Sequence, residues 1–251
     1  NDEGWGLQPW AAQTFEREAG NIGPKTYEQV FRLLLRLKGN MLWPAMHQVS
    51  RAFNDNPRNA ELAQRYGIVM GSSHAEPMLR NNVSEWKAPH DQYNYATHAD
   101  QVRDYWAGRL KTNGRFENLY TLGMRGIHDS GMQGGSTVAE KQALLNRLLA
   151  DQRELFRQHV GVPAKSPQIF VPYKEVLPLL GTPPGLSLPD DITLVWPDDN
   201  FGYIRQFPDA AQAKRSGGSG IYYHLSYLGA PLSYLWLDTT PPALVARGMG
   251  R

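Results

Sequence analysis

The segment Ile169-Phe170-Val171-Pro172-Tyr173-Lys174-Glu175 is a short apolar run that breaks at a proline and continues into reactive polar side chains. A continuous apolar run is typical of a strand in a parallel sheet, because both faces of such a sheet are covered. Polar residues just after several parallel strands are the arrangement in which a (β/α) barrel builds its active site. Five other segments have the same form, and they lie at residues 42–47, 68–76, 122–129, 194–200 and 221–224.

Helical patterns separate these runs. Pro24 begins a pattern that continues to Lys38 with apolar residues at helical spacing, and Gly39 ends it. The sequences that begin at Thr97 and Thr137 both have the capping-box form, so each is expected to begin a helix. Shorter helices are expected at residues 59–66 and 209–214. The strands are expected at residues 40–43, 67–71, 118–124, 168–171, 192–196, 219–225 and 235–237.

This alternation of strands and helices predicts an α/β fold, a (β/α)8 TIM barrel that forms one catalytic domain over residues 1–251. Asn1–Glu3 resembles the polar end of a truncated strand, and counting it brings the number of strands to eight. We therefore expect an incomplete first strand and an incomplete last helix, in a piece of a larger multidomain protein. The glycine-rich segment Arg215–Gly220 precedes a strand, so it is expected to be a tight turn and not a phosphate-binding loop.

The composition argues against several classes of protein. Lys and Arg total 26 against 24 for Asp and Glu, and no basic stripe is visible, so neither nucleic acid nor a membrane is an expected partner. No run approaches the roughly 18 apolar residues of a membrane span. The chain has no cysteine, which excludes disulfides, thiolate metal sites and cysteine nucleophiles.

Two strand-end carboxylates form the predicted catalytic pair. Asp129 and Glu175 follow neighbouring strands, so the fold would place them beside one pocket, as glycoside hydrolysis requires of its acid and base. Arg125 lies four residues before Asp129 and Lys174 directly precedes Glu175, so a cation beside each carboxylate would lower its pKa. Alternatively, Arg125 could bind a carboxylate of an acidic sugar. His74 is the second candidate for that role.

Two further observations bear on the site. The polar and aromatic segment 77–97 follows a strand end and is long enough to act as a lid over a sugar. Asp198 and Asp199 could equally cap the turn that follows them.

Two other functions fit parts of this pattern. His47, His74, Glu76 and His224 at strand ends would suit a metal-dependent barrel hydrolase, but the His-x-His pair common in such barrels is absent, and we predict no metal and no cofactor. The aromatic residues near strand ends would also suit a carbohydrate-binding domain without catalysis. They are Trp43, Tyr173, Trp196, Tyr222 and Tyr223.

The strand-end motifs, taken in order, resemble glycoside hydrolase family 115, the xylan α-1,2-glucuronidases. The resembling stretches are NDEGWGLQPW (1–10), LWPAMH (42–47), GIVMGSSHAEPMLRNN (67–82), YTLGMRGIHDSGM (120–132), QIFVPYKEV (168–176), TLVWPDDNFGYI (193–204), RSGGSGIYYHLSY (215–227) and LWLDTTPPAL (235–244).

The resemblance implies an inverting enzyme that removes glucuronic acid or its 4-O-methyl ether from xylan, with Asp129 and Glu175 as the catalytic carboxylates. Which of the two is the acid stays open. Glucuronoxylan or its oligosaccharides are the expected partner, and the full-length protein is expected to be a secreted or periplasmic bacterial homodimer. We expect the substrate to contact Asp2, Trp43, His47, His74, Glu76, Arg125, His128, Tyr173, Lys174, Asp199, Asn200, Tyr223 and His224.

Overall fold

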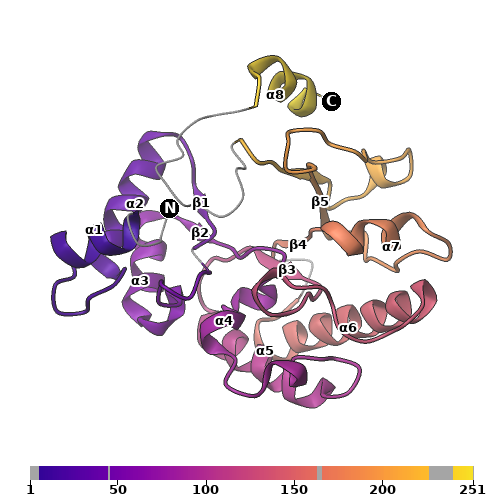
Figure 1. Ribbon diagram of the computed structural model, residues 1–251, viewed down its shortest axis with the longest axis horizontal. Coiled ribbons are helices and arrows are strands. Elements are labelled where there is room, and N and C mark those ends of the chain that lie inside the picture. Colours follow the sequence, from indigo (N-terminus) through magenta and orange to yellow (C-terminus); the bar gives the residue numbers. More distant parts are fainter. Residues whose placement is uncertain (1–5, 45, 163–165, 226–239, 251) are drawn as a thin grey trace.

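The computed structural model describes residues 6–44, 46–162, 166–225 and 240–250. Within these residues the chain forms an α/β fold with parallel strands (Figure 1). The predicted strand at 235–237 and the stretch Asn1–Glu3 lie outside the described residues. The strands are β1 (Met41–Leu42), β2 (Val69–Met70), β3 (Tyr120–Leu122), β4 (Gln168–Phe170), β5 (Thr193–Pro197) and β6 (Ser219–Tyr222).

The strands pair in the order in which they occur in the chain. β1 pairs with β2, and β3, β4, β5 and β6 form a second sheet in that order, with every pairing parallel. A parallel bridge between Met70 and Asn118 connects the two sheets. A doubly wound sheet would reverse its strand order at a switch point, and these strands do not. Among the described residues the strands do not close into a barrel, although the rings of Trp43 and Tyr222 at the two outer strands lie 5.7 Å apart.

The strand positions agree with the expected runs, and both faces of the central strands are buried. Phe170 and Leu194 belong to the main core between the sheet and the helices α5 (Ala99–Asn113) and α6 (Val138–His159). Their neighbours in sequence, Ile169 and Val195, pack on the opposite face with Val171 and Tyr173. Successive side chains of a strand point to opposite faces, so a continuous apolar run covers both.

A second, smaller core lies under α2 (Pro24–Arg36) and α3 (Pro57–Tyr66), where Phe31, Phe53 and Ile68 are buried. The sequence signals explain how these helices begin and end. Pro24 is at the first turn of α2, and the side chain of Asn56 accepts a hydrogen bond from the backbone N–H of Arg58 at the start of α3.

One capping box was predicted correctly and the other was not. At α6 the Thr137 side chain and Glu140 form the reciprocal pair of hydrogen bonds. At α5 the N-cap residue is His98, and the Thr97 hydroxyl bonds the His98 ring instead of the helix. The predicted helix at 209–214 is reduced to a 3-10 turn at Gln212–Lys214. The remaining helices are α1 (Leu7–Thr14), α4 (Asn82–Glu85), α7 (Leu177–Gly181) and α8 (Pro242–Met249).

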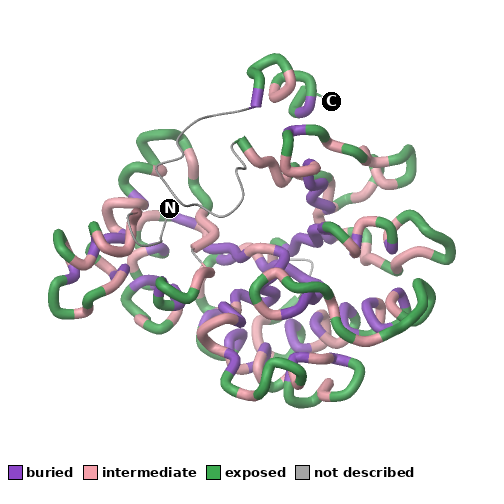
Figure 2. Tube along the Cα trace, in the orientation of Figure 1, coloured by how far each residue is buried: buried purple, intermediate pink, exposed green. Residues whose placement is uncertain are grey.

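The segment 77–97 is not a lid. Trp86, Tyr93 and Tyr95 are buried in the main core with α5 and α6, and only shorter stretches of the segment are exposed (Figure 2). The polar composition of the segment predicted a loop over the site. Packing removes its large aromatic side chains from water, and this burial holds the segment against the core. None of the described helices combines the length and the apolar character needed to cross a membrane.

Candidate active site

The two predicted catalytic carboxylates lie at the same edge of the sheet. Asp129 belongs to a 3-10 turn after β3, and Glu175 belongs to a 3-10 turn after β4, the strand that pairs with β3. The side chain of Asp129 is 32% exposed and that of Glu175 is 31% exposed. Both carboxylates are thus held by the protein on one side and open to solvent on the other.

A single buried guanidinium connects the pair. The Arg125 side chain is 3% exposed, and its Nε and Nη2 donate to the two oxygens of Glu175 at 3.0 and 2.7 Å. Its Nη1 contacts Oδ1 of Asp129. All three nitrogens of Arg125 therefore face carboxylates of this chain. This arrangement favours the interpretation in which Arg125 orients the acidic pair, and binding of a substrate carboxylate by Arg125 stays a prediction.

His74 is the third group at Asp129. Its Nε2 lies 2.9 Å from Oδ1 of Asp129. Burial lowers the pKa of His74 to about 3, and the positive charges of Arg125 and Lys174 act in the same direction. The imidazole is therefore neutral near pH 7, and a neutral ring that binds a carboxylate through Nε2 must carry its proton there. His74 thus donates a hydrogen bond to Asp129.

Lys174 does not pair with the carboxylate beside it in sequence. Its Nζ lies 3.0 Å from Oδ2 of Asp129, which follows the neighbouring strand β3. The backbone of Lys174 is left-handed, with a φ of +47°. The prediction that Lys174 serves Glu175 is therefore wrong, because its ammonium group pairs with the carboxylate that follows the neighbouring strand.

Glu175 is held in its ionised form. Burial alone would raise its pKa, but the hydrogen bonds from Arg125 and from backbone N–H groups, including that of Met132 at 3.1 Å, outweigh burial and lower the pKa below its usual value. A carboxylate that accepts this many hydrogen bonds is stabilised as an anion.

Non-glycine residues with left-handed backbone gather at these strand ends. His128 and Asp129 after β3, Lys174 after β4 and Asn200 after β5 have φ values between +47° and +70°. Such conformations cost roughly 1–3 kcal/mol each and cluster at functional sites. Asn82, which the sequence analysis did not select for the site, supports the first of these turns. Its side chain accepts from the His128 N–H and donates to the carbonyl of Ala75.

Aromatic rings form one wall of the site. The ring of Tyr173 lies 4.0 Å from that of His74, and Tyr222 lies 5.4 Å from His74 and 5.0 Å from His224. Tyr222, the last residue of β6, faces these residues, and the predicted Tyr223 just after the strand does not contact the His74 ring. The Tyr223 hydroxyl instead donates to the carbonyl of Gly202.

The residues after β5 organise the turn and the wall. The carboxylate of Asp198 is buried, accepts from the N–H groups of Asn200, Gly202 and His224, and binds Nδ1 of His224 at 2.5 Å. The side-chain oxygen of Asn200 accepts from the Tyr173 hydroxyl at 2.8 Å. Asn200 and His224 are therefore at the site, and Asp198, absent from the predicted set, positions both.

Asp199 has the turn-capping contacts that were one of its two expected roles, and its contact with substrate stays a prediction. Its carboxylate accepts from the N–H groups of Phe201 and Tyr203 and pairs with Arg205. Burial is the largest single influence and would raise its pKa, but the hydrogen bonds from Arg205, Tyr203 and Phe201 together outweigh burial and lower the pKa below its usual value. The turn-capping interpretation of Asp199 thus describes its contacts in the structure.

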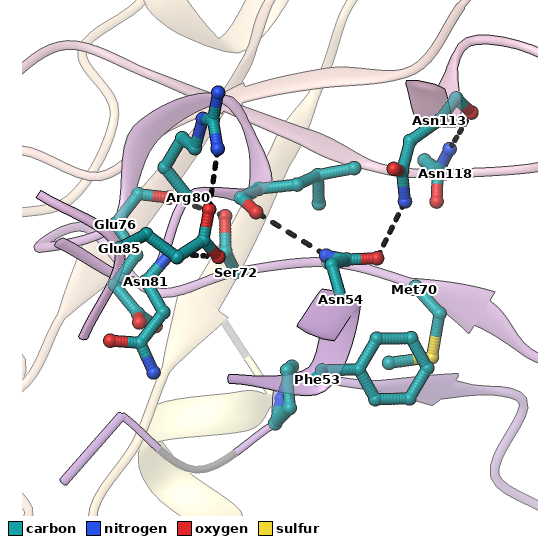
Figure 3. Close-up of a pocket in the computed structure, with 13 residues that line it drawn as sticks. Phe53, Asn54, Met70, Ser72, Glu76, Arg80, Asn81, Glu85, Asn113 and Asn118 are labelled. Atoms are coloured by element: carbon teal, nitrogen blue, oxygen red, sulfur yellow. Dashed lines mark hydrogen bonds and ion pairs between the residues drawn. The ribbon is translucent and has the colours of Figure 1, made fainter. Parts of the chain in front are cut away.

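Glu76 does not join this cluster. Its side chain lines an enclosed cavity of about 20 Å³, room for about one water, together with Arg80, Glu85 and Asn54 (Figure 3). Burial, and secondarily the charge of Glu85, raise the pKa of Glu76 to about 8. The structure thus places Glu76 at this small cavity and not beside the predicted acidic pair.

The other predicted residues lie as follows. The rings of His47 and His128 are in edge contact at 5.5 Å, and Trp43 packs against Tyr222. Asp2 lies outside the described residues. In the part of the chain that the structure describes, no group of three or more His, Asp or Glu side chains is arranged to hold a metal ion.

Comparison with known proteins is consistent with this arrangement. A sequence model described as glycosyl hydrolase family 115 matches residues 1–251. No curated protein is significantly similar to the chain. One solved structure, described as a novel family GH115 4-O-methyl-α-glucuronidase, BtGH115A, with specificity for decorated arabinogalactans, is 47% identical over 100% of this chain, with a TM-score of 0.91. The chain spans 33% of that protein's length.

Proposed function

Because the chain belongs to glycosyl hydrolase family 115, we propose that it is the catalytic part of an enzyme that hydrolyses an α-linked glucuronosyl branch of a polysaccharide. The branch sugar is glucuronic acid or its 4-O-methyl ether, and an α-1,2 linkage joins this sugar to a xylan main chain. The similar solved structure is described as specific for decorated arabinogalactans, so that polymer is the second substrate to assay.

The observation that carries the proposal is the pair Asp129 and Glu175 on one buried guanidinium. Two carboxylates that stand at adjacent strand ends, each about a third exposed, can act from two sides of one sugar. Arg125 holds both of them in a defined geometry before the substrate arrives.

We assign the base to Glu175 and the acid to Asp129. Glu175 takes a proton from water, the water oxygen bonds to the anomeric carbon, and the bond from that carbon to the main-chain oxygen breaks. Asp129 gives its proton to the departing oxygen, so the anomeric configuration inverts. The lowered pKa of Glu175 suits a base. For Asp129 to act as the acid its carboxyl group must be protonated in the substrate complex, so at least one of the cations that contact it, Lys174 or Arg125, must move away when the substrate binds.

The strand arrangement supports a further architectural proposal. Six parallel strands that pair in chain order form an arc, and we propose that this arc belongs to an eight-stranded barrel inside a larger multidomain enzyme. The site would then occupy the end of the barrel at which β3, β4 and β5 finish.

The proposal is tested in the full-length enzyme with Asp129→Ala and Glu175→Ala. Both variants should lose about 10²–10⁴-fold in kcat on glucuronoxylan, as expected for loss of a general acid or base. On 4-nitrophenyl α-D-glucuronide, whose leaving group needs no proton, Asp129→Ala should recover most of its activity and Glu175→Ala should not.

The opposite pattern would exchange the two roles, and undiminished activity in both variants would show that this pair is not catalytic. Proton NMR of the freshly released sugar checks inversion, since the β-anomer must appear first.

A further inference from the structure

The tight loop Asp199–Tyr203 after β5 exposes two large aromatic side chains. Phe201 is 69% exposed and Tyr203 is 51% exposed. Exposed apolar side chains occur singly on many proteins, but a concentration of them beside a reactive site marks a surface that binds something.

Hydrogen bonds hold this loop in one shape. The N–H of Asp199 donates to the carbonyl of Tyr203 at 3.0 Å, and the carboxylate of Asp199 accepts from the N–H groups of Phe201 and Tyr203 at 3.1 Å each. Gly202 has a φ of +87°, and a Cβ there would lie 2.8 Å from the Tyr223 hydroxyl, so only glycine fits. The loop that carries Phe201 is therefore already ordered, so it loses little conformational entropy when a ligand binds.

The loop is continuous with the candidate active site. Asn200, the residue before Phe201, accepts a hydrogen bond from the Tyr173 hydroxyl, and the ring of Tyr173 lies 4.0 Å from that of His74. His74 in turn binds Asp129. Three side-chain contacts, Asn200–Tyr173, Tyr173–His74 and His74–Asp129, thus connect the residue next to Phe201 with a proposed catalytic carboxylate.

A hollow of about 240 Å³ adjoins the same loop. It lies between the loop and α8, and its lining combines apolar side chains with polar surface and the cation of Arg247. The residues that line it are Gly202, Tyr203, Ile204, Phe207, Leu244, Arg247 and Gly248.

We propose that the loop Asp199–Tyr203 and this hollow bind the neutral sugar main chain from which the acidic branch is cleaved. This inference rests on the proposed function, because a branch-removing enzyme must accommodate the polymer next to the scissile bond. The carboxylates of Asp129 and Glu175 stand at the reactive site, whereas the loop offers aromatic surface and its own carboxylate, Asp199, is paired with Arg205. Pyranose rings present apolar C–H faces that pack on such surfaces, and tyrosine adds a hydroxyl for the sugar hydroxyls.

The test uses Phe201→Ala in the full-length enzyme, with Leu37→Ala as the matched control. Leu37, the residue that follows α2, is 71% exposed and lies far along the chain from the loop. Phe201→Ala should raise KM on glucuronoxylan about tenfold, while kcat/KM on 4-nitrophenyl α-D-glucuronide stays within about twofold. Leu37→Ala should change neither value, and Phe201→Trp should restore the low KM.

Two outcomes would overturn the inference. Equal losses on both substrates would mean that Phe201 supports the catalytic centre, and a polymer KM equal to that of Leu37→Ala would mean that the loop binds no main chain. Electrophoresis through gels that contain glucuronoxylan separates this inference from the proposed function. Retardation that Phe201→Ala abolishes supports the binding surface even without turnover, whereas a wild-type enzyme that releases no uronic acid contradicts the function alone.

Discussion

Two clusters in this molecule use the same chemistry with opposite exposure. In the cluster around Glu85, the carboxylate is 7% exposed and binds Arg80 and Arg109 at 2.6 Å each, and Arg109 is itself 8% exposed. Both signs of charge are buried there, next to the cavity that Glu76 lines. This closed cluster connects α4 to α5.

In the open cluster around Arg125, only the cation is buried. The carboxylates of Asp129 and Glu175 keep about a third of their surface exposed, while Arg125 keeps 3%. The two turns that carry Asp129 and Glu175 also have left-handed backbone at non-glycine residues. The comparison shows that an arginine–carboxylate pair by itself indicates neither structure nor catalysis. The two clusters differ in whether water and substrate can reach the carboxylates.

The largest expected effect comes from Arg125→Met in the open cluster. Loss of the guanidinium frees both carboxylates and removes the hydrogen bonds that keep the pKa of Glu175 low. We expect kcat/KM on glucuronoxylan to fall about 10³-fold, comparable to loss of a catalytic group. The pH–rate profile should also lose activity on its acidic side at higher pH than in the wild type.

The control for this change is Arg109→Met in the closed cluster, which should leave the pH–rate profile unmoved. If Arg125 instead recognises the substrate carboxylate, Arg125→Met should lose discrimination against a neutral glucosyl analogue, with the acidic side of the profile unchanged.

The second effect is on stability, and it belongs to Glu85→Gln. This change leaves Arg80 and Arg109 buried beside a neutral amide. Breaking a buried pair in this way costs about 3–5 kcal/mol of unfolding free energy. Urea denaturation should show that loss, while kcat/KM of the folded enzyme stays within about threefold of wild type. A large loss of turnover without destabilisation would show that the closed cluster takes part in catalysis.

The third effect is the pH dependence of His74, which the variant His74→Gln removes. Its pKa is about 3 in the folded protein against 6.5 for an unperturbed histidine, so between these values the unfolded chain binds a proton that the folded chain does not. Stability therefore falls as the pH drops from about 6.5 towards 3. His74→Gln should lose less stability between pH 6.5 and 4.5 than wild type, measured by thermal melting.

His90→Gln serves as the control, because His90 is an exposed histidine outside both clusters. If it changes the acid sensitivity as much as His74→Gln does, the assignment to His74 is wrong.

The smallest effect has the opposite sign and comes from Glu76, two residues further along the chain. Its pKa of about 8, against 4.5 ordinarily, means that the folded state keeps a proton that the unfolded chain releases. Stability from this group is present below about pH 4.5 and is lost as the pH rises towards 8. Glu76→Gln should flatten this decline in thermal melts between pH 6 and 8.5. The exposed Glu61→Gln should leave it unchanged, and an unchanged decline in Glu76→Gln would place the titration elsewhere.

His74 and Glu76, two residues apart in the chain, show which features can be predicted from the sequence and which cannot. The strand ends at residues 42, 70, 122, 170 and 197 were predicted to within about two residues, because apolar runs and the Pro or Gly breaks that end them are local signals. The acidic pair followed from those strand ends. His74 and Glu76 were assigned to one site on the same ground, but the structure sends one to Asp129 and the other into the closed cavity.

The order of strands and helices and the chemistry at each strand end can be predicted from the amino-acid sequence, since these depend on residues close together in the chain. The folded structure was needed to show that Lys174 binds Asp129, that Arg125 bridges both carboxylates, that Tyr222 and not Tyr223 faces His74, and that the segment 77–97 packs into the core. Burial and pairing are set by groups that lie tens of residues away in sequence. They also depend on backbone turns, such as the one at the left-handed residue Lys174, that the local sequence does not predict.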